Sequence, residues 1–185
     1  MILPDKRTMI CALALLVSVH SGAIAQSSPT QTASTQVSAR VFTPLAITSN
    51  EALRFGNLFS PFSAKTIAWT DNAASSGRAR FTITGEGGAE LALSITVPAS
   101  IAAGVHEIPL SAVELRHGTT DADASGTTVA LNTGGSNALT VTMGGAAMSS
   151  QSYFLRLRAT ATPGASQASG TYTGTISVAV NYTGS

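Results

Sequence analysis

The chain has 185 residues, of which ten are Lys or Arg and nine are Asp or Glu, for a formal net charge of +1. Such a sparse and balanced charge excludes the basic surface that binds nucleic acid or an anionic membrane. The single cysteine, Cys11, falls in an expected export signal, so the exported chain has no disulfide and no cysteine-based metal site. One domain is expected at this length, and the composition indicates no activity.

The N-terminus is typical of a Sec-type signal peptide. The basic pair Lys6-Arg7 precedes an apolar run over residues 9–19, and Ala23-Ile24-Ala25 supplies the small residues that signal peptidase needs. We therefore expect cleavage between Ala25 and Gln26. The apolar run is too short to cross a bilayer, so we expect an exported protein without a membrane span, in the periplasm, at the cell surface or outside the cell.

Residues 26–36 are polar and predict a flexible tail, and residues 37–185 predict a single domain. Within that domain apolar and polar residues alternate with a period of two, and no window keeps the helical period of 3.6. The alternation is clearest in Glu90–Val97 and in Thr171–Thr183. Such strands bury one face and leave the other wet, as in antiparallel sheets.

In chain order, strands are predicted at Val37–Thr48, Leu53–Phe59, Lys65–Thr70, Ala79–Thr84, Glu90–Val97, His106–Leu110, Val113–Arg116, Thr127–Leu131, Leu139–Met143, Tyr153–Thr160 and Thr171–Thr183. Clusters of Gly, Asp, Asn and Ser separate these segments and indicate turns. Many short strands with frequent turns favour an all-β sandwich or barrel. Most of the core bulk is expected from the larger aromatic residues: Phe55, Phe59, Phe62, Trp69, Phe81 and Phe154.

Few residues could carry chemistry. Two histidines follow the expected signal, His106 and His117, and His117 precedes Asp121 and Asp123 in a polar loop. One histidine and two carboxylates without EF-hand spacing fit a solvated loop better than a metal site. The chain has no Gly-x-Ser-x-Gly elbow and no phosphate-binding loop. We therefore expect no catalytic residue, no metal and no cofactor, in a protein that is not an enzyme.

The C-terminal segment carries the most specific motif. Gln167 is followed by Gly170-x-Tyr172-x-Gly174 and then by Val178-x-Val180-x-Tyr182. This ending resembles the bacterial domain of unknown function 4402 family. It is also similar to spore coat protein U-like proteins and, more loosely, to chaperone–usher pilus subunits. Three further segments resemble the first family: Val41–Ile47 with Pro44-Leu45, Leu53-x-Phe55-Gly56, and Phe81-x-Ile83-x-Gly85.

The resemblance implies an immunoglobulin-like, Greek-key sandwich that is secreted and displayed at the surface. By analogy with pilus subunits, it implies a structural protein that assembles with copies of itself or related subunits by strand donation, helped by a periplasmic chaperone. Val37, Ala39 and Val41 are the candidate strand-pairing or donor residues. The candidate groove or final-strand residues are Tyr172, Ile176, Val178, Val180 and Tyr182. Two alternatives stay open: a sandwich that pairs its own first and last strands, and a monomeric surface-binding module for carbohydrate or adhesion.

Overall fold

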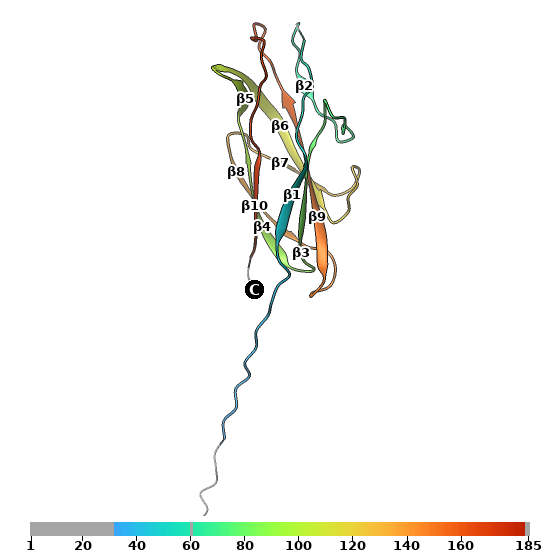
Figure 1. The fold of residues 1–185 in the computed structure, drawn as a ribbon, viewed down its shortest axis with the longest axis vertical. Coiled ribbons are helices and arrows are strands. Elements are labelled where there is room, and N and C mark those ends of the chain that lie inside the picture. Colours follow the sequence, from blue (N-terminus) through green and yellow to red (C-terminus); the bar gives the residue numbers. More distant parts are fainter. Residues whose placement is uncertain (1–31, 60, 184–185) are drawn as a thin grey trace, which may run out of the picture. The chain divides into compact units, whose positions relative to one another are not determined.

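The structure is a computed structural model that describes residues 32–59 and 61–183 (Figure 1). Its contacts divide the chain after Ala39. The expected cleavage site, Ala25 and Gln26, lies outside the described residues. Within the described ranges there is no helix, and hence none that could cross a membrane. The strands are β1 (Ala46–Glu51), β2 (Lys65–Thr66), β3 (Ala79–Glu86), β4 (Glu90–Val97), β5 (Ser100–Ala103), β6 (His106–Gly118), β7 (Thr127–Ala130), β8 (Gly135–Thr142), β9 (Ser150–Ala161) and β10 (Ser177–Tyr182).

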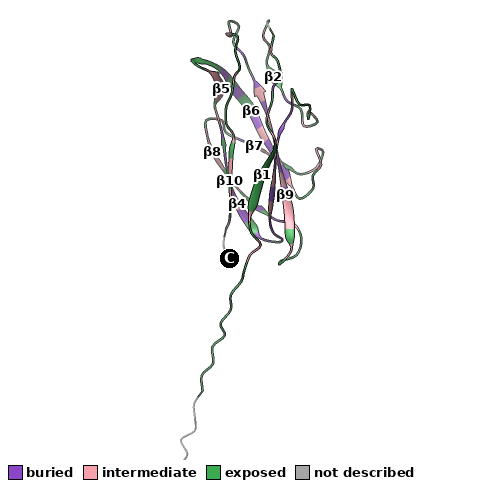
Figure 2. Ribbon diagram, viewed as in Figure 1, coloured by how far each residue is buried: buried purple, intermediate pink, exposed green. Residues whose placement is uncertain are grey.

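The strands form two antiparallel sheets. The larger sheet has the order β1-β3-β9-β6-β5, with β2 paired to β9 and β7 paired to β6. The smaller sheet has the order β10-β4-β8. Buried apolar residues of both sheets form a single cluster (Figure 2). The predicted all-β sandwich is therefore confirmed.

Alternation along the strands builds this core. In β4, Leu91, Leu93, Ile95 and Val97 are all at most 2 % exposed, whereas the residues between them are half-buried or exposed. Two of the core residues of β9, Leu155 and Leu157, are fully buried. Complete burial of one such side chain stabilises the fold by about 1.5–3 kcal/mol. The period-two pattern thus correctly identified the inner faces of these strands.

A β-bulge merges two predicted strands into one. His106–Leu110 and Val113–Arg116 were expected separately, but β6 runs through both and shifts its register against β9 between Ser111 and Glu114. Ala112 takes a positive φ of 46° at this bulge. The extra residue reverses the alternation, so Ile108 and Leu110 before it and Val113 and Leu115 after it all face the core.

Four predicted strands are much shorter than expected or absent, and one strand was missed. Of the predicted strand Lys65–Thr70, only the two residues of β2 form a strand. Pairing at the N-terminus begins only at Ala46, and the last strand begins only at Ser177. The segment Leu53–Phe59 is not a strand, because it holds one isolated bridge and then turns at Gly56, where φ is 73°. The missed strand is β5, which forms a hairpin with β6 through a two-residue turn.

The aromatic core prediction was partly wrong. Phe55 and Phe81 are buried, but Phe59 is 76 % exposed. Trp69 is half-buried, and the guanidinium carbons of Arg116 and Arg158 lie 4.4 Å and 4.7 Å from its ring centroid. Trp69 therefore covers wet-face arginines of the larger sheet by cation–π contact instead of filling the core.

Candidate functional site: a groove between the first and last strands

The chain just before β1 is fastened to the sandwich by one buried carboxylate. Glu86 is 1 % exposed, and its Oε2 accepts hydrogen bonds from the Thr43 amide at 3.0 Å and the Thr43 hydroxyl at 2.7 Å. Its Oε1 accepts from the Met148 amide at 2.5 Å and lies 3.5 Å from the Arg40 guanidinium. The hydrogen bonds from Thr43, followed by those from Met148 and Arg40, lower the pKa of Glu86 to about 2. Glu86 is therefore a fixed anion that anchors residues 40–43.

The last strand meets the same segment. The Tyr182 hydroxyl donates to the Thr43 carbonyl at 2.7 Å and accepts from the Glu86 amide at 2.7 Å. Its ring lies 5.1 Å from that of Phe42. A Cβ on Gly85 would stand 2.7 Å from the Tyr182 hydroxyl oxygen, so this approach requires glycine at position 85. At this end of the sandwich the first and last strands are closely joined.

At the opposite end the two segments are separated by an apolar groove of about 970 Å³. One wall is formed by residues 52–59, which follow β1, and the other by residues 167–176, which precede β10. Core side chains form the floor: Phe55, Ala79, Phe81, Ile101, Ile108 and Leu110.

Both walls contain backbone groups that have no backbone partner among the described residues. Arg54 exchanges two backbone hydrogen bonds with Gly77, and Thr173 exchanges two with Ala102. In an extended chain the neighbours of a paired residue point their N–H and C=O groups to the other edge. Leu53 on one wall and Tyr172 on the other therefore present unpaired edges. Among the described residues, no other backbone hydrogen bond is made by residues 52–59.

Tyr172 is held rigidly in its wall. Its hydroxyl donates to the Ala168 carbonyl at 2.7 Å and accepts from the Gln167 side-chain amide at 2.6 Å. Gly174 packs against β5, where an added Cβ would lie 3.0 Å from Ile101 Cγ2. The Gln167, Gly170-x-Tyr172-x-Gly174 motif thus builds one wall of the groove and keeps it in place without an extra strand.

The predicted site residues separate into three groups. Tyr172 and Ile176 line the groove. Val178, Val180 and Tyr182 lie in β10, where they pair with β4 and pack on the core. Val37 and Val41 are 91 % and 88 % exposed, and with Ala39 they lie in a stretch, residues 32–45, that forms no strand. We call residues 32–39 the N-terminal arm.

Sequence reasoning missed the opposite wall. Leu53, Phe55 and Leu58 were expected inside a regular strand, where their backbone would be paired. Gly56 was the available signal, because a glycine in the interior of a predicted strand marks a bend. In this segment only Arg54 is paired, because its partner Gly77 forms a single isolated bridge.

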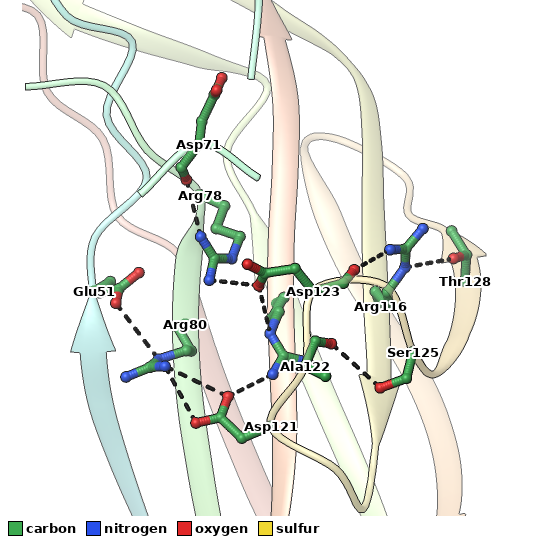
Figure 3. Close-up of polar contacts among 11 residues, drawn as sticks. Glu51, Asp71, Arg78, Arg80, Arg116, Asp121, Ala122, Asp123, Ser125 and Thr128 are labelled. Atoms are coloured by element: carbon green, nitrogen blue, oxygen red, sulfur yellow. Dashed lines mark hydrogen bonds and ion pairs between the residues drawn. The ribbon is translucent and has the colours of Figure 1, made fainter. Parts of the chain in front are cut away.

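The polar loop after β6 is not freely solvated, contrary to expectation. Asp121 pairs with Arg156 and Arg80, and Asp123 pairs with Arg78 and Arg156 (Figure 3). Arg156 and Arg78 are only 1 % and 4 % exposed. The loop therefore neutralises a row of arginines on the outer face of the larger sheet.

The histidines do not join the loop carboxylates. His117 is buried, its Nδ1 lies 2.8 Å from the Tyr153 hydroxyl, and burial lowers its pKa while raising that of Tyr153. His106 lies exposed at the other end of β6. Among the described residues there is no group of three or more His, Cys, Asp or Glu side chains that could hold a metal ion.

The sequence profile described as "Domain of unknown function (DUF4402)" matches residues 45–182. The chain belongs to the DUF4402 family. No curated protein and no solved structure matches it. The matched range starts at Leu45, just after the anchored segment, and ends at Tyr182, so it contains both walls of the groove.

Proposed function

We propose that this DUF4402 protein is a non-enzymatic, exported structural subunit of the bacterial envelope or surface, and that it assembles by β-strand donation. One observation carries the proposal: an apolar groove with unpaired backbone on both walls lies between the first and last strands. An added strand satisfies such edges by backbone hydrogen bonds and fills such a groove with alternate side chains. The immunoglobulin-like, Greek-key topology that accompanies this role in pilus subunits stays a prediction.

The same groove supports the proposed partners. Exposed apolar surface with open strand edges promotes aggregation unless it is covered. Before assembly, a periplasmic chaperone would cover the groove, and in the assembled state a copy of the chain or a related subunit would do so. The proposal includes export of the chain, directed by a signal peptide in residues 1–25.

The test is the assembly state of the exported protein. The full-length gene is expressed in a bacterium that processes signal peptides, and the product is studied by size-exclusion chromatography and negative-stain electron microscopy. We expect polymers or a chaperone-bound monomer. A free, stable monomer at all concentrations would refute the proposal and favour the alternative, a monomeric surface-binding module. The ion-paired loop 119–126 is the rigid element that such a module would present to its ligand.

A further inference from the structure

The N-terminal arm has an alternating pattern of its own. From residue 33 to residue 39 the odd positions are small or apolar, and the even positions are polar. The odd positions are Ala33, Thr35, Val37 and Ala39, and the even ones between them are Ser34, Gln36 and Ser38. Such a pattern suits a strand with one buried face. Within the arm, however, no residue is paired and Val37 is 91 % exposed.

The Glu86 anchor sets the C-terminal limit of any segment that can leave its own domain. Thr43 is hydrogen-bonded through its amide, its hydroxyl and its carbonyl, and Arg40 is paired with the same carboxylate. Residues from Arg40 onward are therefore committed to their own sandwich. In the arm before Arg40, the described residues are exposed and belong to no strand.

We propose that residues 33–39 of one copy of the chain occupy the groove of a second copy, with Ala33, Thr35, Val37 and Ala39 facing its floor. This inference rests on the proposed function. It names the donor segment, the side chains of that segment that face the groove, and the acceptor. It differs from the donor first considered on sequence grounds, because Val41 follows the Arg40 anchor and stays with its own domain.

The dimensions agree. At about 3.3 Å per residue, an inserted strand of this length spans about 23 Å. The wall from Gly170 to Ile176 has the same number of residues. Tyr172 and Ile101 both line the groove, and the four inward positions of the arm carry side chains no larger than valine.

Charge agrees as well. No residue from 26 to 39 is charged, so the arm can enter an apolar site without the cost of burying an ion. The first charged residue after this stretch is Arg40, which is already paired with Glu86. The charge-free stretch thus ends where the anchor begins.

A second copy fits better than the same chain. The anchored segment lies at the end of the sandwich opposite the groove, so filling the groove of the same chain would require a reversal of direction within residues 40–45. Residues 40–45 contain no turn, and both the amide and the carbonyl of Thr43 are held by the sandwich. Reversal would break this anchor, whereas donation to a neighbour leaves it intact.

The experiment compares two substitutions on opposite faces of the arm in the full-length exported protein. Val37→Asp places a charge on the inward face, and Ser38→Asp places the same charge on the outward face. We expect Val37→Asp to lower the fraction of polymer at least tenfold and Ser38→Asp to change it less than twofold. Both variants should keep the wild-type melting temperature as monomers, because Val37 makes no core contact.

A second measurement tests peptide binding to the groove of a chain whose own arm is altered. The Val37→Asp chain still has its groove, so it should bind a wild-type peptide of residues 30–41 with one peptide per chain. The Ser38→Asp peptide should bind equally, and the Val37→Asp peptide at least tenfold more weakly, as measured by isothermal titration calorimetry.

The outcomes separate this inference from the proposed function. If Val37→Asp chains still polymerise, the arm is not the donor, although assembly itself is upheld. If the wild type is monomeric and its Val37→Asp variant binds the peptide, the arm fills its own groove and the second copy is wrong. If neither assembly nor peptide binding occurs, the proposed function fails together with the inference.

Discussion

Replacing Asp121 with Asn removes a charge but almost no volume, and it tests whether the loop after β6 is held electrostatically. Beneath this loop, three arginines lie side by side on neighbouring strands: Arg156 on β9 is the direct cross-strand partner of Arg80 on β3 and of Arg116 on β6. Like charges placed opposite one another destabilise a sheet. Asp121 relieves this repulsion through its pairs with Arg156 and Arg80.

The magnitude follows from exposure. A charge pair about 4 Å apart contributes about 4 kcal/mol at an effective dielectric constant of about 20. Asp121 is 42 % exposed, and solvent screening reduces the contribution by about half. Arg156, at 1 % exposure, cannot turn to water when Asp121 loses its charge, and it then keeps only its pair with Asp123. We therefore expect Asp121→Asn to lower the free energy of unfolding by about 2–3 kcal/mol. That loss lowers the melting temperature by about 4–12 °C.

Urea unfolding followed by circular dichroism measures this change. The matched control is Glu107→Gln, which also removes one negative charge but affects an exposed side chain with a single hydrogen bond to Ser100. The control should cost less than about 0.5 kcal/mol. Adding Arg156→Met to Asp121→Asn should recover stability, because it removes a buried charge that has lost one of its two carboxylate partners, while Asp123 keeps its pair with Arg78. If Asp121→Asn costs no more than the control, the loop is not held by its charges.

Two further predictions concern the anchor and the bulge. Because the folded-state pKa of Glu86 is lowered to about 2, its stabilisation is complete above its ordinary value of 4.5 and is lost as the pH falls through about 2. Glu86→Gln should therefore melt lower than the wild type at pH 7 and converge with it near pH 2; parallel melting curves across this range would contradict the assignment. Ala112→Gly should raise stability by about 1 kcal/mol, because glycine adopts the positive φ of the bulge without strain. Ala102→Gly in β5 is the control and should lower stability; a loss at both positions would show that Ala112 is unstrained.

Local patterns predicted the inner faces of the strands well. The burial of Leu91, Leu93 and Ile95 follows from period-two alternation alone, because consecutive side chains of a strand point to opposite faces. The Gly170-x-Tyr172-x-Gly174 and Val178-x-Val180-x-Tyr182 motifs likewise predicted the family, and residues 45–182 match it.

Predictions failed where a residue's role depends on a distant partner. Trp69 is a large aromatic residue of the kind expected in a core, but its ring contacts arginines of β6 and β9. Ala112 reverses the alternation of β6 because β9 imposes the pairing on both sides of the bulge. Neither neighbour can be read from the flanking sequence.

The sequence by itself determined the fold class, the family and the inward residues of most strands, because these depend on spacing between near neighbours. The groove was decided only in three dimensions. It exists because Glu86 and Tyr182 join the first and last strands at one end, while Arg54 and Thr173 pair with other segments at the opposite end. Strand pairing between residues far apart in the chain sets which edges stay open, and open edges between the two ends of the chain are the feature on which the proposed assembly depends.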